Sequence, residues 1–136
     1  MTRLFRSRST NIIYQYISKV GENASKYHNQ KIEYYDPTRK ELIKFDSIKE
    51  RDYYLVLKDR ERRGEISQLS RQYPIEIQPS FETPSGEKIR AIVYYADFVY
   101  YEGGKLHIID VKGYKTEVYK LKKKLLAYQG FYIEEV

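Results

Sequence analysis

Two β-rich runs separated by Gly103-Gly104 constrain the fold of this chain more than any other feature. The first run covers residues 90–102 and the second covers residues 105–112. Glycine readily adopts the positive φ angles of type I′ and II′ turns, so the pair predicts a two-residue β-hairpin. Such a turn also sets the register, because Glu102 must then pair with Lys105. Paired residue numbers along the hairpin therefore sum to 207.

This register brings two acids and a lysine together. It predicts the cross-strand pairs Tyr100 with His107, Val99 with Ile108, Phe98 with Ile109 and Asp97 with Asp110. Because side chains alternate along a strand, Lys112 shares a face with Asp110. Opposed Cβ atoms are about 4.5 to 5.5 Å apart, and like charges at that separation destabilise the pair. A divalent cation would offset the repulsion, since Mg²⁺ binds through one or two carboxylates, with water and phosphate completing its coordination.

The trio therefore predicts a metal-dependent nuclease. Asp97 and Asp110 would bind Mg²⁺ or Mn²⁺, and Lys112 would orient the attacking water or stabilise the phosphate. The structural alternative is that one acid is protonated or forms a salt bridge with Lys112. The chain has no cysteine and only two histidines, His28 and His107, which excludes thiolate zinc sites and argues against a histidine-rich one. His107 is expected to be a cross-strand partner only.

The residues around the trio resemble the signature of restriction-endonuclease-like nucleases, the PD-(D/E)XK superfamily. Residues 96–98 are similar to its first half, with alanine in place of proline, and residues 108–112 to its second half, with aspartate in place of the commoner glutamate. The chain as a whole resembles a family of small phage and prophage proteins of unknown function within this superfamily. The motifs that carry this resemblance are residues 25–31, 45–50, 64–66, 78–81, 90–100 and 110–113.

The resemblance implies hydrolysis of phosphodiester bonds in DNA, in phage recombination, repair or processing. A Holliday junction is one such substrate, and it would require a homodimer, because two strands must be cut symmetrically. The first core helix of the superfamily often contributes a glutamate to the catalytic metal site, and Glu50 matches it. Ser47-x-x-Glu50 also has the pattern of a capping box, which explains Glu50 without a metal. Gln78 is a weaker candidate at the edge of the site, and its alternative is an ordinary strand end.

The predicted elements follow the order of this nuclease core. They are a helix over residues 47–63, strands over 73–78, 89–101 and 105–111, a helix over 117–128 and a last strand over 131–135, with a turn at 84–86 and a short helix over 10–19 before them. We therefore expect an α/β fold with a restriction-endonuclease-like core, a mixed sheet flanked by helices. Residues 1–44 would be a basic N-terminal arm, and residues 45–136 the core of one globular domain.

Positive charge brackets an acidic centre. Residues 1–44 carry nine Lys/Arg and four Asp/Glu, and residues 112–128 carry six Lys and one Glu. Residues 45–111 carry ten Lys/Arg and twelve Asp/Glu. This distribution is expected of a protein that binds a phosphate backbone at its periphery. The expected DNA contacts are Lys115, Lys120, Lys122, Lys123, Lys124, Arg3, Arg6 and Arg8, with a merely solvated surface as the alternative.

The helix over residues 117–128 has its own apolar pattern. Val118, Leu121, Leu125 and Tyr128 recur at helical spacing, and we expect them to form its buried stripe. Most of the lysines of this helix would then lie outside.

Three other classes of function stay open beside a Mg²⁺- or Mn²⁺-dependent deoxyribonuclease. The first is a catalytically silent DNA-binding module of the same fold. The second is an interaction protein that uses a surface rich in the 16 tyrosines, and the third is a ribonuclease. The chain has no apolar run of 18 residues and no signal-peptide pattern, so we expect a soluble intracellular protein with no membrane partner.

Overall fold

The computed structural model describes residues 31–136 in two compact units, an N-terminal unit that ends at Arg63 and a C-terminal unit from Gly64 to Val136. The predicted helix over residues 10–19 and the arginines Arg3, Arg6 and Arg8 lie outside the described residues, as does most of the motif at residues 25–31. Within the described range, no helix is both long enough and apolar enough to cross a membrane.

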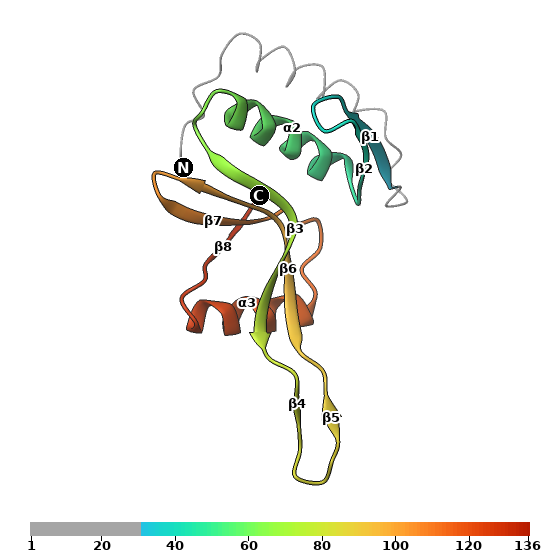
Figure 1. The fold of residues 1–136 in the computed structure, drawn as a ribbon, viewed down its shortest axis with the longest axis vertical. Coiled ribbons are helices and arrows are strands. Elements are labelled where there is room, and N and C mark those ends of the chain that lie inside the picture. The colour runs from blue at the N-terminus through green and yellow to red at the C-terminus, as the bar shows by residue number, and fades with distance from the viewer. Residues whose placement is uncertain (1–30) are drawn as a thin grey trace. The chain divides into compact units, whose positions relative to one another are not determined.

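The N-terminal unit consists of a β-hairpin followed by a helix (Figure 1). Strand β1 (Ile32–Asp36) pairs antiparallel with β2 (Glu41–Phe45), and α2 (Ile48–Arg62) follows. The rings of Phe45 and Tyr54 meet in its core, with centroids 5.2 Å apart. The sequence does not predict this hairpin, which falls mostly within the stretch expected to be a basic arm.

Helix α2 begins where the capping pattern predicts. Ser47 is the N-cap residue, and its hydroxyl accepts a hydrogen bond from the backbone N–H of Glu50 at 3.1 Å. The Glu50 carboxylate accepts from the backbone N–H of Asp46 at 3.1 Å, one residue before the N-cap amide that a capping box would use. The two side chains thus provide acceptors for two backbone donors at the helix start.

The C-terminal unit is built on a four-stranded mixed sheet with the strand order β3-β6-β7-β8 (Figure 1). Its strands are β3 (Ser67–Gln78), β6 (Ile92–Glu102), β7 (Lys105–Asp110) and β8 (Ile133–Glu135), and α3 (Glu117–Tyr128) connects the last two. Neighbouring strands are antiparallel except β7 and β8, which are parallel because the chain crosses over through α3. From α2 onward, the predicted helices and strands occur in the predicted order, with a further two-stranded ribbon between the first two strands of the sheet, and the mixed α/β class is confirmed.

Strand β3 forms one edge of this sheet. It contains Pro74, which has no N–H to donate and is therefore tolerated on an edge strand. Between β3 and β6 the chain continues into a two-stranded ribbon of β4 (Phe81–Glu82) and β5 (Lys88–Ile89) (Figure 1). The predicted turn at residues 84–86 is confirmed, since the Gly86 N–H donates to the carbonyl of Thr83 at 2.9 Å.

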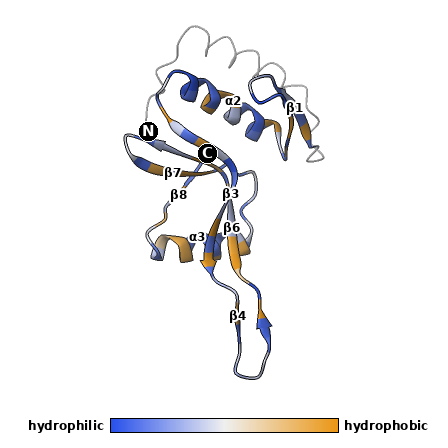
Figure 2. Cartoon of the chain, in the orientation of Figure 1, coloured by the Kyte–Doolittle hydropathy of each residue, from blue (hydrophilic) through white to orange (hydrophobic). Residues whose placement is uncertain are grey.

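One face of the sheet packs against α3. The buried residues of this core are Ile75, Tyr94, Ala96, Val99, Ile108, Tyr119, Leu126 and Ile133. Figure 2 shows apolar residues on α3 and on the strands β3 and β6. Because every strand of the sheet and the helix contribute to this one cluster, it holds the C-terminal unit together.

The predicted buried stripe of α3 is wrong. Its residues are Val118, Leu121, Leu125 and Tyr128, and their side chains are 63%, 56%, 37% and 94% exposed. The buried residues of the helix are instead Tyr119 and Leu126.

The physical reason lies in the lysines between those two buried residues. Lys122 and Lys123 are half-buried on the side of α3 that carries Tyr119 and Leu126. Lysine can lay its aliphatic stem along apolar surface while its ammonium group reaches a polar partner. Here the two ammonium groups reach a main-chain carbonyl of β6 and a carboxylate of β8. Lys122 and Lys123 therefore pack against the sheet, although the sequence pattern predicts that they face solvent.

Candidate functional site

The hairpin between β6 and β7 has the predicted register near its turn, but the predicted pair of Asp97 with Asp110 is not formed. Gly103 and Gly104 have φ angles of 58° and 77°, in the left-handed region that glycine enters without steric penalty. The confirmed pairs include Phe98 with Ile109, Val99 with Ile108, Tyr100 with His107 and Glu102 with Lys105. The ladder ends at the first of these pairs, one position before Asp97 would meet Asp110.

His107 is a cross-strand partner, as predicted. Its ring stacks on that of Tyr100 with centroids 5.1 Å apart and an angle of 11° between the planes. Its Nδ1 lies 2.6 Å from a carboxylate oxygen of Glu134 in β8. These contacts account for the side chain without any part in catalysis.

Asp97 lies in β6 and is held from both neighbouring strands. Its Oδ2 accepts a hydrogen bond from the backbone N–H of Val111, the residue after β7, at 2.8 Å. Its Oδ1 accepts from the side-chain amide of Gln72 in β3 at 3.3 Å. The carboxylate therefore joins three strands at the point where the β6–β7 ladder ends.

Gln72, rather than the predicted Gln78, lies at the edge of this site. The register of β3 with β6 places Gln72 across from Asp97. Gln72 has a φ of 46°, in the left-handed region where a residue with a side chain is strained by about 1 kcal/mol or more. Gln78 lies six residues further along β3, which is about 20 Å in an extended strand. It is too distant to contact Asp97.

Asp110 ends β7 and is only 2% exposed. The Tyr94 hydroxyl donates a hydrogen bond to its Oδ2, and the ammonium of Lys112 lies 3.2 Å from its Oδ1. Within residues 31–136, Oδ1 accepts no well-aligned hydrogen bond. Oδ1 is therefore paired by charge with Lys112, and a cation bound there would have to share or displace this contact.

Lys112 completes the predicted trio. Its Nζ lies between the Asp110 carboxylate and the ring of Tyr119, 4.1 Å from the ring centroid. The carboxylate and the aromatic face both attract the ammonium group. The salt bridge anticipated as the structural alternative is therefore present, in the same place as the predicted catalytic lysine.

Two tyrosines join the acids in one electrostatic cluster. Burial, the hydrogen bond to Asp110 and the charges of Asp110 and Asp97 raise the pKa of Tyr94 far above its usual value. Burial and the charges of Asp110, Glu135 and Asp97 likewise raise the pKa of Tyr119. Both phenols therefore stay protonated at neutral pH. The Tyr119 hydroxyl is buried and has no hydrogen-bond partner in the described part of the chain.

A third carboxylate, that of Glu135, stands beside Asp110. The two residues are paired in the parallel register of β7 and β8. Glu135 forms ion pairs with Lys115 at 2.6 Å and with Lys123. Hydrogen bonds from these two lysines lower the pKa of Glu135, although burial acts in the opposite direction. Glu135 thus connects the segment before α3 and the helix itself to the last strand.

The remaining lysines predicted to contact DNA are placed differently. Lys120 pairs with Glu117 at 3.0 Å on the outside of α3, and Lys122 donates to the carbonyl of Val93 at 2.9 Å. Lys124 is exposed. Lys120 and Lys124 can therefore reach a ligand directly, whereas Lys122 would first have to leave the sheet.

Glu50 belongs to the N-terminal unit and is 3% exposed. Its contact with the Asp46 backbone gives it a capping role at the start of α2. Its role as a metal ligand stays a prediction.

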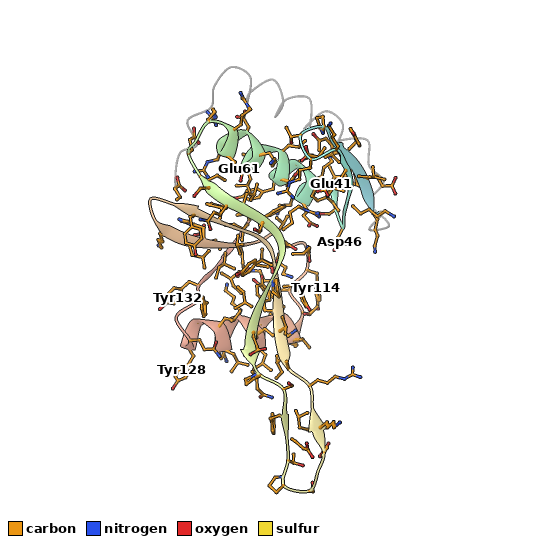
Figure 3. The ribbon with its side chains drawn as sticks, in the orientation of Figure 1. Glu41, Asp46, Glu61, Tyr114, Tyr128 and Tyr132 are labelled. Carbon is orange, nitrogen blue, oxygen red and sulfur yellow. The ribbon has the colours of Figure 1, made fainter. Side chains whose placement is uncertain are left out.

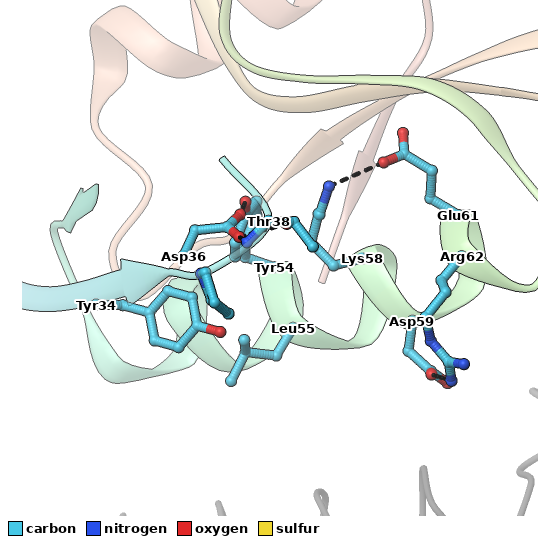
Figure 4. Close-up of a pocket in the computed structure, with 10 residues that line it drawn as sticks. Tyr34, Asp36, Thr38, Tyr54, Leu55, Lys58, Asp59, Glu61 and Arg62 are labelled. Carbon is cyan, nitrogen blue, oxygen red and sulfur yellow. Dashed lines mark hydrogen bonds and ion pairs between the residues drawn. The ribbon is translucent and has the colours of Figure 1, made fainter. Parts of the chain in front are cut away.

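The N-terminal unit also contains a pocket of about 560 Å³ beside Asp36 (Figure 4). Asp36 accepts hydrogen bonds from the Thr38 N–H at 2.8 Å, the Arg39 N–H at 3.3 Å and the Tyr54 hydroxyl at 2.6 Å, and also from the Thr38 hydroxyl. Burial alone would raise the pKa of Asp36, but these hydrogen bonds outweigh it and hold the pKa well below its usual range. The polar contacts of this acid are therefore satisfied within the protein.

Four residues of the cluster are not predicted by the sequence, namely Gln72, Tyr94, Tyr119 and Glu135. The two tyrosines are among 16, and their spacing does not distinguish them from the others. Glu135 has one usable signal. A predicted strand that returns after a helix pairs in parallel with an earlier strand, which would place this acid near Asp110.

Comparisons with known proteins bear on the family of the chain. No curated protein matches it. A family model described as "Protein of unknown function (DUF1064)" matches residues 24–135, a span that includes both acids and the lysine of the trio. Because this match covers most of its length, the chain belongs to the DUF1064 family.

Proposed function

We propose that this protein is a metal-dependent deoxyribonuclease that hydrolyses phosphodiester bonds. The observation that carries the proposal is the convergence of Asp97, Asp110 and Lys112 where the β6–β7 ladder ends. The resemblance of these residues to the PD-(D/E)XK signature supports it, as does the order of helices and strands along the chain. The same resemblance supports a role in phage DNA recombination, repair or processing, on branched DNA such as a Holliday junction.

The residues of the site suit a hard divalent cation. Asp97 and Asp110 would hold Mg²⁺ or Mn²⁺, and the Lys112 ammonium that now pairs with the Oδ1 of Asp110 marks where a cation is attracted. Among residues 31–136, no three His, Cys, Asp or Glu side chains form a group that could hold a metal alone. Two carboxylates completed by water and phosphate are a usual arrangement for Mg²⁺. When bound, such an ion would lower the pKa of a water molecule and offset charge on the phosphate.

Neighbouring residues fix both acids in place. Tyr94 holds Asp110, while Gln72 and the Val111 backbone hold Asp97, so the carboxylates need little rearrangement during the reaction. Lys112 would orient the attacking water or stabilise the negative charge that develops on the phosphate.

The proposal is tested by incubating the full chain with linear duplex, single strand, flap and four-way junction in Mg²⁺ and in Mn²⁺. We expect metal-dependent cleavage of at least one substrate, with no product from Asp110→Ala. Binding without cleavage in either metal would favour the catalytically silent DNA-binding module. Cleavage of structured RNA but not of DNA would favour a ribonuclease.

The exposed apolar face of α3 supports a second candidate function, a protein-interaction module. Besides the four residues of its stripe, Tyr114 and Tyr132 are 83% and 72% exposed. Figure 3 shows Tyr128 and Tyr132 projecting outward from this part of the chain. Exposed apolar surface of this kind often marks an interaction site. Failure to bind any DNA at moderate salt would favour this candidate over the nuclease.

A further inference from the structure

Two of the lysines assigned to phosphate contacts converge on one carboxylate, that of Glu135. Lys115 lies 2.6 Å from its Oε2, and Lys123 pairs with its Oε1. Each carboxylate oxygen therefore takes one ammonium group. Two oxygens of a phosphate can bind a pair of lysines in the same way, through charge-assisted hydrogen bonds.

The two lysine side chains are accessible to a ligand, whereas the Oε2 of Glu135 is buried. Lys115 and Lys123 are 52% and 39% exposed, and Glu135 is 19% exposed. Ion pairs at such exposure contribute little to stability, because water solvates the separated charges well. An incoming polyanion can therefore reach the two ammonium groups and compete with the Glu135 carboxylate for them.

The lysine pair also lies next to the proposed reacting centre. Glu135 is the parallel partner of Asp110, and neighbouring strands are about 4.8 Å apart. Successive phosphates of one DNA strand rise by about 3.4 Å along the helix axis. A strand with its scissile phosphate at Asp97 and Asp110 would therefore bring a neighbouring phosphate within reach of Lys115 and Lys123.

We infer that Lys115 and Lys123 form a binding site for a DNA backbone phosphate, and that Glu135 occupies this site in the free protein as a competing anion. The inference rests on the proposed function, because it requires DNA as the ligand. Binding exchanges two internal ion pairs for two contacts with phosphate. Glu135 therefore weakens binding to DNA that engages the lysine pair, because its two ion pairs must break first.

Glu135→Gln tests this inference, with Glu134→Gln as the matched control. Both variants change the net charge equally and lie in the same strand, but Glu134 contacts His107 instead of the two lysines. Affinity for a short fluorescent duplex is measured by anisotropy in EDTA at several salt concentrations, so that metal-dependent cleavage does not intervene. We expect Glu135→Gln to bind about threefold more tightly than the wild type, and its salt dependence to steepen by about one in log–log slope. Glu134→Gln changes both by less.

A second experiment tests whether the gain in DNA affinity of Glu135→Gln depends on Lys115 and Lys123. In a Lys115→Ala/Lys123→Ala background, we expect Glu135→Gln to have no more effect than Glu134→Gln, with thermal melting to verify that each variant is folded. Equal affinities for Glu135→Gln and Glu134→Gln would overturn the inference, as would a gain that persists without the lysines. In both cases the proposed nuclease would stand. Absence of DNA binding by the wild type would overturn the proposed function and the inference with it.

Discussion

Asp36 and Asp110 are both buried acids at the ends of strands, yet their surroundings differ. Asp36 ends β1 and accepts hydrogen bonds from two backbone amides and two hydroxyls. Asp110 ends β7 and accepts one well-aligned hydrogen bond from Tyr94, while its other oxygen faces Lys112. The two side chains are 3% and 2% exposed. Burial alone therefore does not separate them.

The difference lies in how completely each carboxylate is satisfied. Structural acids are surrounded by donors of the protein itself, because an unsatisfied buried oxygen costs about 1–3 kcal/mol. A carboxylate that binds a metal or reacts must keep part of its capacity for its ligand. On this criterion Asp36 is a structural acid of the N-terminal unit, and Asp110 is the acid to which we assign the proposed role in chemistry.

The largest expected effect is the loss of DNA cleavage when Asp110, but not Asp36, is substituted. Asp110→Asn removes the charge of the proposed metal ligand but keeps an oxygen that can accept from Tyr94. We expect the rate of DNA cleavage to fall about a thousandfold, as for other groups that stabilise charge in a transition state. Asp97→Ala and Lys112→Ala should also lose metal-dependent cleavage. Glu134→Gln serves as the control, and full activity in Asp110→Asn would remove this acid from the catalytic site.

The next largest effect is a loss of folding stability when Asp36 is substituted. Asp36→Ala leaves the Thr38 and Arg39 amides and two hydroxyls without their acceptor, so we expect the free energy of unfolding to fall by about 3 kcal/mol. Urea denaturation measures it, with the exposed Glu33→Gln of the same strand as the control. Cleavage per folded molecule stays unchanged. An unaffected unfolding transition would contradict the structural role of Asp36.

The same acid predicts a dependence of stability on pH. Its folded-state pKa is depressed below the unfolded value of about 3.9. Its contribution is therefore present above about pH 4 and is lost as the pH falls from there toward the folded pKa. Asp36→Asn should show a shallower loss of stability between pH 5 and about pH 3 than the wild type.

At alkaline pH we expect stability to be lost near Asp110 rather than near Asp36, because the tyrosines beside Asp110 titrate there. The pKa values of Tyr94 and Tyr119 are raised in the folded state, so their contribution is present below about pH 10 and is lost as the pH rises above it. We expect each tyrosine to cost about 1.4 kcal/mol of unfolding free energy at about pH 11. Tyr119→Phe should remove one such loss and should not destabilise the protein at neutral pH, since the hydroxyl has no hydrogen-bond partner among residues 31–136. Chemical denaturation across this pH range measures both effects.

The smallest effect concerns Glu50, a third buried acid. Glu50→Gln keeps an oxygen that can accept from the Asp46 amide, so we expect the unfolding free energy to change by about 0.5 kcal/mol or less. If Glu50 only caps the helix, cleavage changes little, because the cap is retained. A tenfold loss of cleavage with an intact fold would instead identify Glu50 as a metal ligand.

The sequence predicts the parts of the site that depend on local chemistry. Gly103 and Gly104 determine the hairpin register through their positive φ angles, and Ser47 determines the start of α2 through its side-chain cap. Both signals act within a few residues, so they can be recognised from the local sequence alone. The trio was predictable because it follows from the same hairpin.

The rest depends on contacts between distant segments. Lys122 and Lys123 turn toward the sheet only because Val93 and Glu135 offer acceptors there. Gln72 meets Asp97 only because β3 pairs with β6 through a residue with positive φ. The spacing of hydrophobic residues does not show where acceptors lie on a distant strand or how two distant strands pair. The buried face of α3 and the edge of the site were therefore predicted wrongly.

The β4–β5 ribbon has a practical consequence. Its turn is held by short contacts such as the Gly86 N–H to Thr83 carbonyl hydrogen bond, and Ser85 lies within it. The chain contains no cysteine. A single Ser85→Cys substitution would therefore introduce one unique thiol at an exposed tip, where sequence changes are well tolerated. A fluorophore attached there would report on binding partners without labelling any residue of the proposed site.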